Sequence, residues 1–312
     1  MAKARGLNVS IIGAGTVGST LARALFDHGY HIVTVISRTG SSAIALAKSV
    51  KCKKASTSVA DIHPETDIII IAVSDNAMTD VIKELSSTKT LQFKKLFITH
   101  TSGVYSVEVL TSLKRKGAAV ASIHPIQSFP KYTDGSKGLS QLRGIYYGID
   151  GESRGLQRAE KLVNDLRGKI VIIPQELKPL YHLICVFASG YMMVFLNTIS
   201  ELSRMLKLRA SWTEVFGPLM TTAMENTVKH SAENVLTGPL ARGDLSTIEL
   251  HLMALSQHAP QFLPLYTING IEFARIAKKH GRISQQEFDQ ILSRFKKFIK
   301  SYSVKKISKV IK

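Results

Sequence analysis

Short apolar runs alternate with helical patterns along the first half of the chain. The runs cover residues 9–12, 32–37, 67–73, 96–99, 118–122, 144–149 and 169–173. The run DIIIIAV, residues 67–73, is apolar almost without interruption, as in a strand buried on both faces of a parallel sheet. Helical patterns lie between the first strands, up to residue 28 and over 42–50. We therefore predict βαβ units and a doubly wound parallel α/β sheet.

The pattern changes after Pro174, where strands give way to long amphipathic stretches. These stretches cover residues 180–206, 212–231, 247–258, 263–279 and 285–300. Gly-Pro pairs at 217–218 and 238–239 are expected to break or kink the helices. We therefore predict an α/β domain over residues 1–174 and an all-α domain over residues 175–312.

The most apolar window, residues 183–199, bears on the location of the protein. It is slightly short for a membrane span and contains a serine, an asparagine and a threonine, so we interpret it as a buried core helix. The first twelve residues lack a signal-peptide pattern, and Cys52 and Cys185 show no metal-type spacing. We therefore expect a cytoplasmic protein without a membrane partner, a structural disulfide or a metal.

The chain has 312 residues and a formal net charge of +18, which raises the question of nucleic-acid binding. Its lysines are scattered, with the densest cluster in the tail over residues 296–312, and no aromatic-interleaved basic patch appears. We interpret the charge as a solvated surface that also attracts anionic substrates, and we expect no nucleic-acid partner. A separate role for the tail stays open.

The stretch VSIIGAGTVGSTLARAL contains G-x-G-x-x-G directly after a predicted strand and at the start of a predicted helix. Gly13 permits a tight turn, Gly15 lets the backbone approach a pyrophosphate, and Gly18 lets the helix pack on the strand. The helix N-terminus favours phosphate through its free N–H groups and its dipole. The predicted dinucleotide loop of a Rossmann domain consists of Gly13, Ala14, Gly15, Thr16, Val17 and Gly18.

The end of the second strand, VISRTGSS, indicates which dinucleotide binds. An NAD site usually has Asp or Glu here to hold the ribose hydroxyls, and none stands at Ser37 or Arg38. A guanidinium with neighbouring hydroxyls suits a 2′-phosphate. We predict that NADP (NADPH) is preferred over NAD, with Arg38 as phosphate ligand and Ser37, Thr39 and Ser41 as further donors.

Two later strands also end in polar residues, where ligands of open α/β sheets bind. The loops that follow are SDNAM, from residue 74, and THTSG, residues 99–103. We expect them to contact the nicotinamide ribose and the carboxamide or substrate. The predicted contacts are Val73, Ser74, Asn76, Thr101 and Ser102. Ser74 and Ser102 are alternatively helix N-caps.

Six motifs occur together and in order: GAGTVG, AVSDNAM, HTSG, HPIQSF, KPLYH…FAS and LTGPLARGD. Over nearly the whole chain they resemble the Rossmann-like proteins with a C-terminal DUF2520 domain, candidate NADP-dependent oxidoreductases of the 6-phosphogluconate dehydrogenase-like group. The resemblance implies a helical domain that forms a homodimer and an active site between the two domains. One departure is Gly190, where the family often has an asparagine after FAS.

His124 is the first candidate for the proton donor that carbonyl or imine reduction needs besides the hydride of the cofactor. It follows the strand over 118–122, and Pro125 biases it to an extended conformation. Its HP dipeptide resembles the HPM motif of prephenate dehydrogenases, whose histidine faces the substrate. Such an imidazole relays a proton or binds a carboxylate. Alternatively, His124 caps loop carbonyls. Gln127 on the same segment is a candidate substrate ligand.

Lys178 begins the predicted helical region, with Tyr181 and His182 near it on one helical face. In β-hydroxyacid dehydrogenases a lysine near this junction is the general acid. The resemblance therefore implies Lys178 as proton donor and His182 as the second candidate. Alternatively, Lys178 is one of many lysines at a helix start.

The segment LTGPLARGDLST supplies two further candidates for substrate binding. Arg242 is a candidate ligand for a substrate carboxylate. Asp244 is a second candidate, but it also suits the N-cap of the helix that begins near Leu245.

These features together predict an NADPH-dependent reductase of a small carboxylate-bearing carbonyl, a ketopantoate-like 2-oxoacid. One alternative is an imine reductase of the pyrroline-5-carboxylate reductase type, which would tolerate a site without a strong acid. Another is a non-catalytic NADPH-binding regulatory protein.

Overall fold

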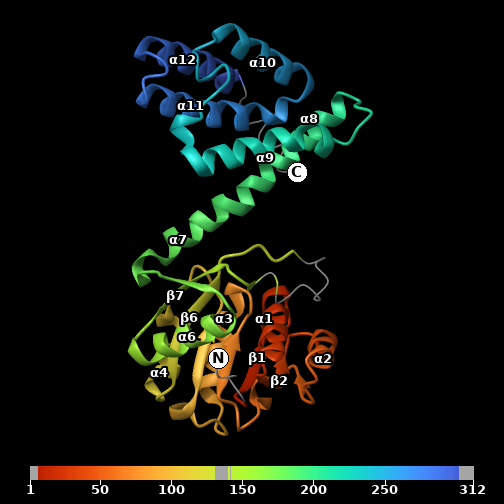
Figure 1. Cartoon of the computed structure of the whole chain (residues 1–312), viewed down its shortest axis with the longest axis vertical. Helices are drawn as coiled ribbons and strands as arrows, with labels where there is room; N and C mark the ends of the chain where they lie inside the picture. Colours follow the sequence, from red (N-terminus) through yellow and green to blue (C-terminus); the bar gives the residue numbers. More distant parts are fainter. Residues whose placement is uncertain (1–5, 131–139, 141, 302–312) are drawn as a thin grey trace. The chain divides into compact units, whose positions relative to one another are not determined.

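The computed structural model describes residues 6–130, 140 and 142–301, and it divides into two compact units, Met1–Tyr191 and Met192–Lys312 (Figure 1). Most of the basic tail predicted over 296–312 lies outside the described residues. The sequence placed the change of domain at residue 174. In the structure, the helix that begins at Lys178 still belongs to the first unit.

A single sheet of eight strands forms the centre of the first unit, in the order β3-β2-β1-β4-β5-β6-β7-β8. The strands are β1 (Asn8–Ile12), β2 (His31–Ile36), β3 (Ala55–Ser56), β4 (Ile68–Ile71), β5 (Phe97–His100), β6 (Ala119–Pro125), β7 (Tyr146–Gly151) and β8 (Lys169–Ile172). The predicted α/β class is confirmed. The sheet is mostly parallel, but β7 runs antiparallel to β6, and the short β3 was missed.

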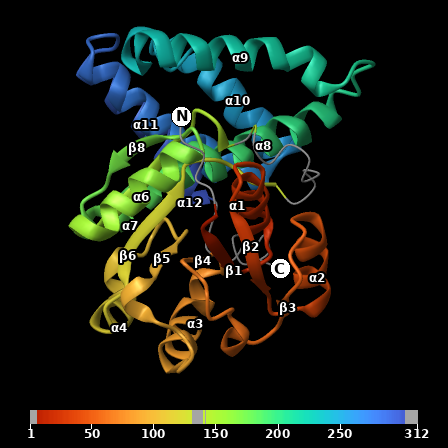
Figure 2. The same ribbon diagram turned by 60° about the horizontal axis from the view of Figure 1, so that its bottom comes forward.

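Helices cover both faces of this sheet (Figure 2). One face carries α1 (Thr16–Asp27), α2 (Gly40–Ser49) and α6 (Ser153–Asp165), and the other carries α3 (Asp75–Ser87) and α4 (Thr111–Arg115). The four isoleucines of β4 are all buried. Ile68 and Ile70 pack in the first layer, and Ile69 and Ile71 in the second. This explains why the strand is apolar at every position.

The register aligns the carboxyl ends of the parallel strands. Ile12 pairs with Ile71, Ile71 with His100, and His100 with Ser122. β1 lies between β2 and β4, so the strand order reverses there, which makes the ends of β1 and β4 the expected ligand crevice.

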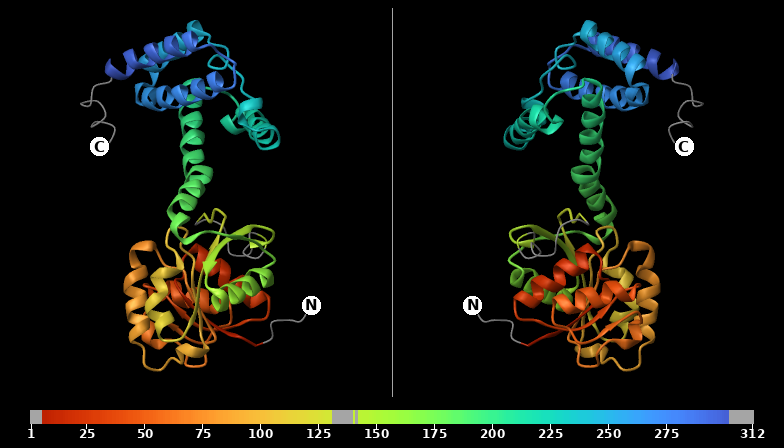
Figure 3. Two further views of the ribbon diagram at one scale, coloured as in Figure 1. Left: turned by 90° about the vertical axis from the view of Figure 1, so that its left-hand side faces the viewer. Right: turned by 90° about the vertical axis from the view of Figure 1, so that its right-hand side faces the viewer.

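After β8, the 3-10 turn Gln175–Leu177 leads into α7 (Lys178–Cys185), a π-helical segment (Val186–Tyr191) and α8 (Met192–Met205) without a break (Figure 3). The interpretation of 183–199 as a buried core helix is wrong, because none of these residues is buried within the chain. The apolar pattern identified a helix, but the side chains of this window stay exposed or half-buried. In the described part of the chain, Gln175–Met205 is the one helix that is long and apolar enough to cross a membrane.

The second unit is helical, as predicted. It contains α8 together with α9 (Trp212–His230), α10 (Leu245–His258), α11 (Leu263–Lys279) and α12 (Gln285–Ser301). A small core is formed by α10, α11 and α12, around Ile248, Leu252 and Phe295. A capping box of Ser211 and Glu214 begins α9, and Pro218 lies inside that helix.

The two glycines at the start of α1 should respond differently to an added methyl group. A Cβ at Gly18 would lie 1.9 Å from the Gly13 carbonyl oxygen, whereas a Cβ at Gly15 meets nothing within 4 Å. We expect Gly18→Ala to lower the free energy of unfolding by about 1–3 kcal/mol, and Gly15→Ala to leave it nearly unchanged. Urea denaturation of both variants measures this. Equal effects would contradict the close packing of α1 on β1.

Candidate functional site

The glycine loop after β1 is tight at two positions and open at the third. Gly13 has φ +110° and donates its N–H to the Ile36 carbonyl at 2.7 Å, and a Cβ there would lie 2.2 Å from the Ala72 carbonyl oxygen. Gly15 faces open space at the N-cap of α1, and no side chain caps this helix end. The free N–H groups and the room at Gly15 fit a pyrophosphate. Ala14, Thr16 and Val17 complete this loop.

The residues after β2 lie where the sequence predicted a 2′-phosphate site. Arg38 is exposed, and no carboxylate follows the strand before Thr39, the N-cap residue of α2. The Thr39 hydroxyl donates to Ser42 Oγ at 2.8 Å, so it already has a partner. Ser37 is half-buried and Ser41 exposed. A guanidinium among hydroxyls therefore fits the phosphate, with Arg38 as the one cation in this loop.

The loops after β4 and β5 hold the other predicted cofactor contacts. Ser74 occupies the N-cap position of α3, but its side chain makes no capping hydrogen bond. Val73 and Thr101 are half-buried, and Asn76 is exposed. Ser102 is buried, and its hydroxyl accepts the N–H groups of Val104 and Tyr105 at 3.3 and 3.1 Å. Ser102 therefore stabilises the turn after β5, and it is not the helix N-cap that the alternative interpretation proposed, because Ser106 caps the next 3-10 helix.

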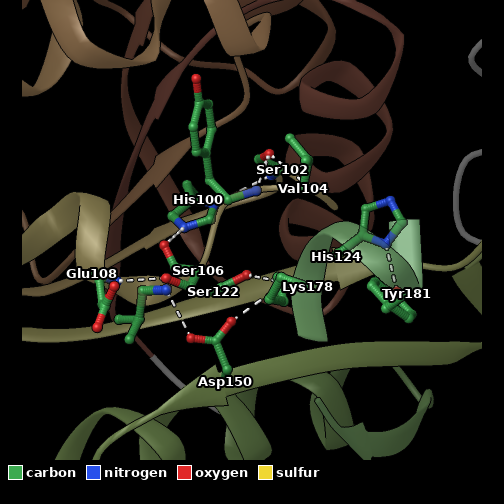
Figure 4. Close-up of polar contacts among 12 residues, drawn as sticks. His100, Ser102, Val104, Ser106, Glu108, Ser122, His124, Asp150, Lys178 and Tyr181 are labelled. Atoms are coloured by element: carbon green, nitrogen blue, oxygen red, sulfur yellow. Dashed lines mark hydrogen bonds and ion pairs between the residues drawn. The ribbon is translucent and has the colours of Figure 1, made fainter. Parts of the chain in front are cut away.

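His124 and Tyr181 form the closest polar pair in this part of the unit (Figure 4). The Tyr181 hydroxyl lies 2.6 Å from His124 Nδ1, and the rings meet edge to face. Burial, followed by the positive charge of Lys178, lowers the pKa of His124 to about 4. Burial also raises the pKa of the Tyr181 phenol above its ordinary value. At neutral pH the imidazole is therefore uncharged and the phenol keeps its proton.

Two glycines make room for these rings. A Cβ at Gly148 would lie 2.4 Å from the Tyr181 hydroxyl. A Cβ at Gly103 would lie 2.6 Å from the His182 ring and 3.0 Å from the His124 ring. The THTSG loop after β5 is thus brought against the HP segment of β6 and the first turns of α7.

Lys178 is fully buried, although a proton donor, its predicted role, must reach the substrate. Its Nζ donates to Ser122 Oγ at 2.8 Å and lies 3.3 Å from Asp150 Oδ2 (Figure 4). The other Asp150 oxygen accepts the Val107 N–H at 2.7 Å. Burial raises the pKa of Asp150 and lowers that of Lys178, while each charge opposes the shift of the other. Because each charge has its partner, we take both groups as ionised.

His100 lies beside this group at the end of β5. Its Nε2 donates to the Ser106 carbonyl at 3.1 Å, and its Nδ1 accepts the Ser102 N–H at 3.2 Å. Burial lowers its pKa to about 4, so it is neutral. Both ring nitrogens are occupied by backbone groups, which makes His100 a structural residue.

The sequence predicted three further substrate ligands, one on the segment after His124 and two in the second unit. Gln127 is exposed, and its side-chain oxygen accepts the Ser128 N–H at 2.9 Å. Arg242 and Asp244 lie in the second unit. Asp244 caps α10 through Thr247 and Ser246, and these hydrogen bonds lower its pKa to about 2. Among the described residues, no group of three or more metal-type side chains occurs.

Sequence reasoning missed Asp150 and Ser122, and it named Tyr181 only as a neighbour of Lys178. A lone aspartate in the otherwise uncharged strand YYGIDG was a usable signal for a buried ion pair. The spacing of Lys178 and Tyr181 placed them on one helix face. Their partners come from β6 and β7, whose antiparallel pairing was not predicted.

Two family models match the chain. One is a Rossmann-like domain over residues 1–125, and the other is a domain of unknown function, DUF2520, over residues 145–272. The chain therefore combines a Rossmann-like domain with a DUF2520 domain. The glycine loop, His100 and His124 lie in the first matched region, and Asp150 and Lys178 in the second.

Solved structures with the same fold are distant in sequence. A candidate NADP oxidoreductase from Bacteroides fragilis is 22% identical with a TM-score of 0.73, covering 86% of this chain and 98% of that one. A Thermotoga maritima protein is 25% identical with a TM-score of 0.63, covering 87% and 98%. An imine reductase from Streptomyces aurantiacus is 16% identical with a TM-score of 0.55, covering 98% and 99%. No curated protein matches the chain.

Proposed function

We propose that the protein is an NADPH-dependent reductase of a small carbonyl that carries a carboxylate, a ketopantoate-like 2-oxoacid. The observation that carries the proposal is the neutral His124–Tyr181 pair at the carboxyl edge of β6. On the same edge of the same sheet, the β1 loop offers an open helix N-terminus for a dinucleotide. The names of the Bacteroides fragilis and Streptomyces aurantiacus proteins support a nicotinamide-dependent reductase.

The cofactor would supply the hydride. The phosphates would lie at the start of α1 against Gly15, and Arg38 would hold the 2′-phosphate. The loops after β4 and β5 would face the nicotinamide ribose and the carboxamide through Ser74, Asn76 and Thr101.

The hydrogen-bond chain at His124 defines the proton chemistry. Since Tyr181 keeps its proton, its hydroxyl donates to Nδ1, and this fixes the tautomer with the proton on Nε2. A neutral Nε2–H donates a hydrogen bond to the carbonyl oxygen and gives its proton as the oxygen gains charge, while the Tyr181 proton moves to Nδ1. His182, whose ring lies 6.2 Å from that of His124, is placed to contact the substrate carboxylate.

The imine alternative rests on the Streptomyces aurantiacus likeness and on the same neutral pair. A protonated imine already carries the charge that a carbonyl must gain, so His124 would then orient the substrate rather than protonate it. The regulatory alternative requires NADPH binding without turnover of either substrate class.

Arg38 should decide the cofactor preference. We expect Arg38→Ala to weaken NADPH binding by about 10- to 100-fold, because a charged hydrogen-bond partner of the 2′-phosphate is lost. NADH binding should change less than about twofold, since NADH lacks that phosphate. Calorimetric titration of both dinucleotides measures this, with Lys48→Ala, which removes an exposed cation from the last turn of α2, as the control. Equal losses for NADH and NADPH would contradict the assignment.

His124 should decide the reaction. With NADPH and a panel of 2-oxoacids, we expect His124→Asn to reduce kcat by about 10²- to 10⁴-fold through loss of the proton donor. NADPH affinity should not change. A panel of cyclic imines separates the alternative, since their reduction should fall much less. Wild-type protein that binds NADPH but reduces neither panel supports the regulatory reading.

We also infer a homodimer through the helical domain. Residues of α9 are nowhere buried, and exposed apolar side chains stand on two opposite sides of this helix, Val215 and Leu219 on one and Met224 and Val228 on the other. A helix that is apolar on two sides needs two covering neighbours, and within the chain α9 packs mainly on α8. We place this dimer in the cytoplasm, without nucleic-acid or membrane partners.

Oligomeric state is measured by light scattering during size-exclusion chromatography. We expect a dimer for the wild type and a monomer for Leu219→Glu, because a buried carboxylate would be left unpaired. Lys229→Glu on the same helix alters charge without removing apolar surface and should stay dimeric. A monomeric wild type, or association only with lipid vesicles, would contradict the inference.

A further inference from the structure

Three separate elements meet at the ammonium of Lys178. Ser122 of β6 and Asp150 of β7 are cross-strand partners in the antiparallel ladder, and both hold Nζ. Asp150 in turn accepts the Val107 N–H from the 3-10 turn Val107–Leu110. Lys178 is the first residue of α7, so one buried cation ties the start of this helix to the edge of the parallel sheet.

This placement removes Lys178 from contact with a substrate. Its side chain has 0% exposure and that of Asp150 has 2%. A group that protonates a substrate must come within hydrogen-bond distance of the reacting atom. The Lys178 ammonium instead donates to Ser122 Oγ and forms an ion pair with Asp150 Oδ2. Paired buried charges of this kind persist because separating them would leave one charge uncompensated in a poor solvent for ions.

The next turn of α7 carries two side chains that are only half-buried. Tyr181 and His182 follow Lys178 by three and four residues, on the same side of the helix. Lys178 Nζ lies 5.6 Å from the Tyr181 ring centroid, and the Tyr181 hydroxyl reaches His124. Since Gly148 lies directly under that hydroxyl, a small shift of the helix would break the contact or force a clash.

We propose that Lys178 is a positioning residue, whose buried contacts with Asp150 and Ser122 fix α7 on the β6–β7 ladder and so align Tyr181 with His124. This inference rests on the proposed reductase function, and it assigns the proton to the His124–Tyr181 pair instead of the lysine. Lys178 acts on the reaction only through those two side chains.

The charge of Lys178 has a second effect on His124. An ammonium held nearby in a buried setting disfavours a second positive charge, so it adds to burial in keeping the imidazole neutral. The titratable and charged groups around His124 are Lys178, Tyr181 and His182 of α7 and His100 of β5. Asp150 of β7 faces Lys178, Asp75 of α3 faces His100, and Cys185 of α7 lies near Tyr181. Removing the ammonium should therefore raise the pKa of His124 toward its ordinary value.

The test is the paired variant Lys178→Met/Asp150→Asn in the full chain. The pair is removed together because Lys178→Met alone leaves a buried carboxylate unpaired, whereas asparagine still accepts the Val107 N–H. The matched control is Lys114→Met/Glu152→Gln, which neutralises an exposed ion pair of the same unit. Imidazole NMR titration of His124 reports its pKa without any substrate, and steady-state kinetics report kcat and KM separately.

We expect the paired variant to raise the His124 pKa, to move the acid limb of kcat to higher pH, and to lower kcat by about tenfold, well short of the loss of a proton donor. The control should change neither quantity. A loss of 10³-fold or more with an unchanged His124 pKa would overturn the proposal in favour of Lys178 as acid, within the range expected for such a donor.

The two proposals fail in different ways. If the wild type reduces no 2-oxoacid or imine, the proposed function fails, but the NMR titration still tests the role of Lys178. In that case, an unchanged His124 pKa in the paired variant overturns the positioning role, and a raised pKa supports it.

Discussion

The buried contact between Lys178, Asp150 and Ser122 is the interaction on which the candidate site depends. Ionised groups that have left water must be compensated locally, and here each partner comes from a different element. The pairing therefore demands that β7 lie beside β6 and that α7 start at one particular place along their ladder. Once this start is fixed, the helical spacing of three residues brings Tyr181 to His124. The buried ion pair of Lys178 and Asp150 thus fixes the position of the uncharged pair of His124 and Tyr181.

Glycines provide a second constraint. At these positions another part of the chain comes so close that a side chain would collide with it. Gly13 and Gly18 let α1 begin directly against β1 and the end of β4, and Gly15 leaves the helix terminus free for an anion. Gly103 and Gly148 do the same for the rings at His124. The first set forms a recognisable motif because its members are neighbours in sequence. The second set does not, because Gly103 and Gly148 come to the rings of His124 and Tyr181 only in the folded chain.

This difference explains how far the sequence could be read. The parallel strands, the dinucleotide loop and the helical second half follow from local periodicity and motif spacing, and the structure bears out the fold class. The antiparallel pairing of β7 depends on contacts that no local pattern encodes. Because this pairing was not predicted, the positions of Asp150 and Ser122 were not predicted either. Lys178 was predicted to be the proton donor, and its burial depends on those same non-local partners. The expected roles of Arg38 and His124 stay predictions.

The apolar helix from Leu183 onward shows the same limit in another form. Hydropathy measures how unfavourable a side chain is in water, and it does not say which surface relieves that cost. A core helix, a membrane span and a helix at a subunit interface can have the same mean hydropathy. Exposure in the chain removes the first reading, as with Ile184 at 61% and Phe187 at 58%. The two apolar sides of α9 favour a subunit interface over a membrane span. A bilayer would cover the helix over Gln175–Met205 but would leave the apolar surface of α9 exposed. We therefore propose that a second copy of the same helices covers both segments.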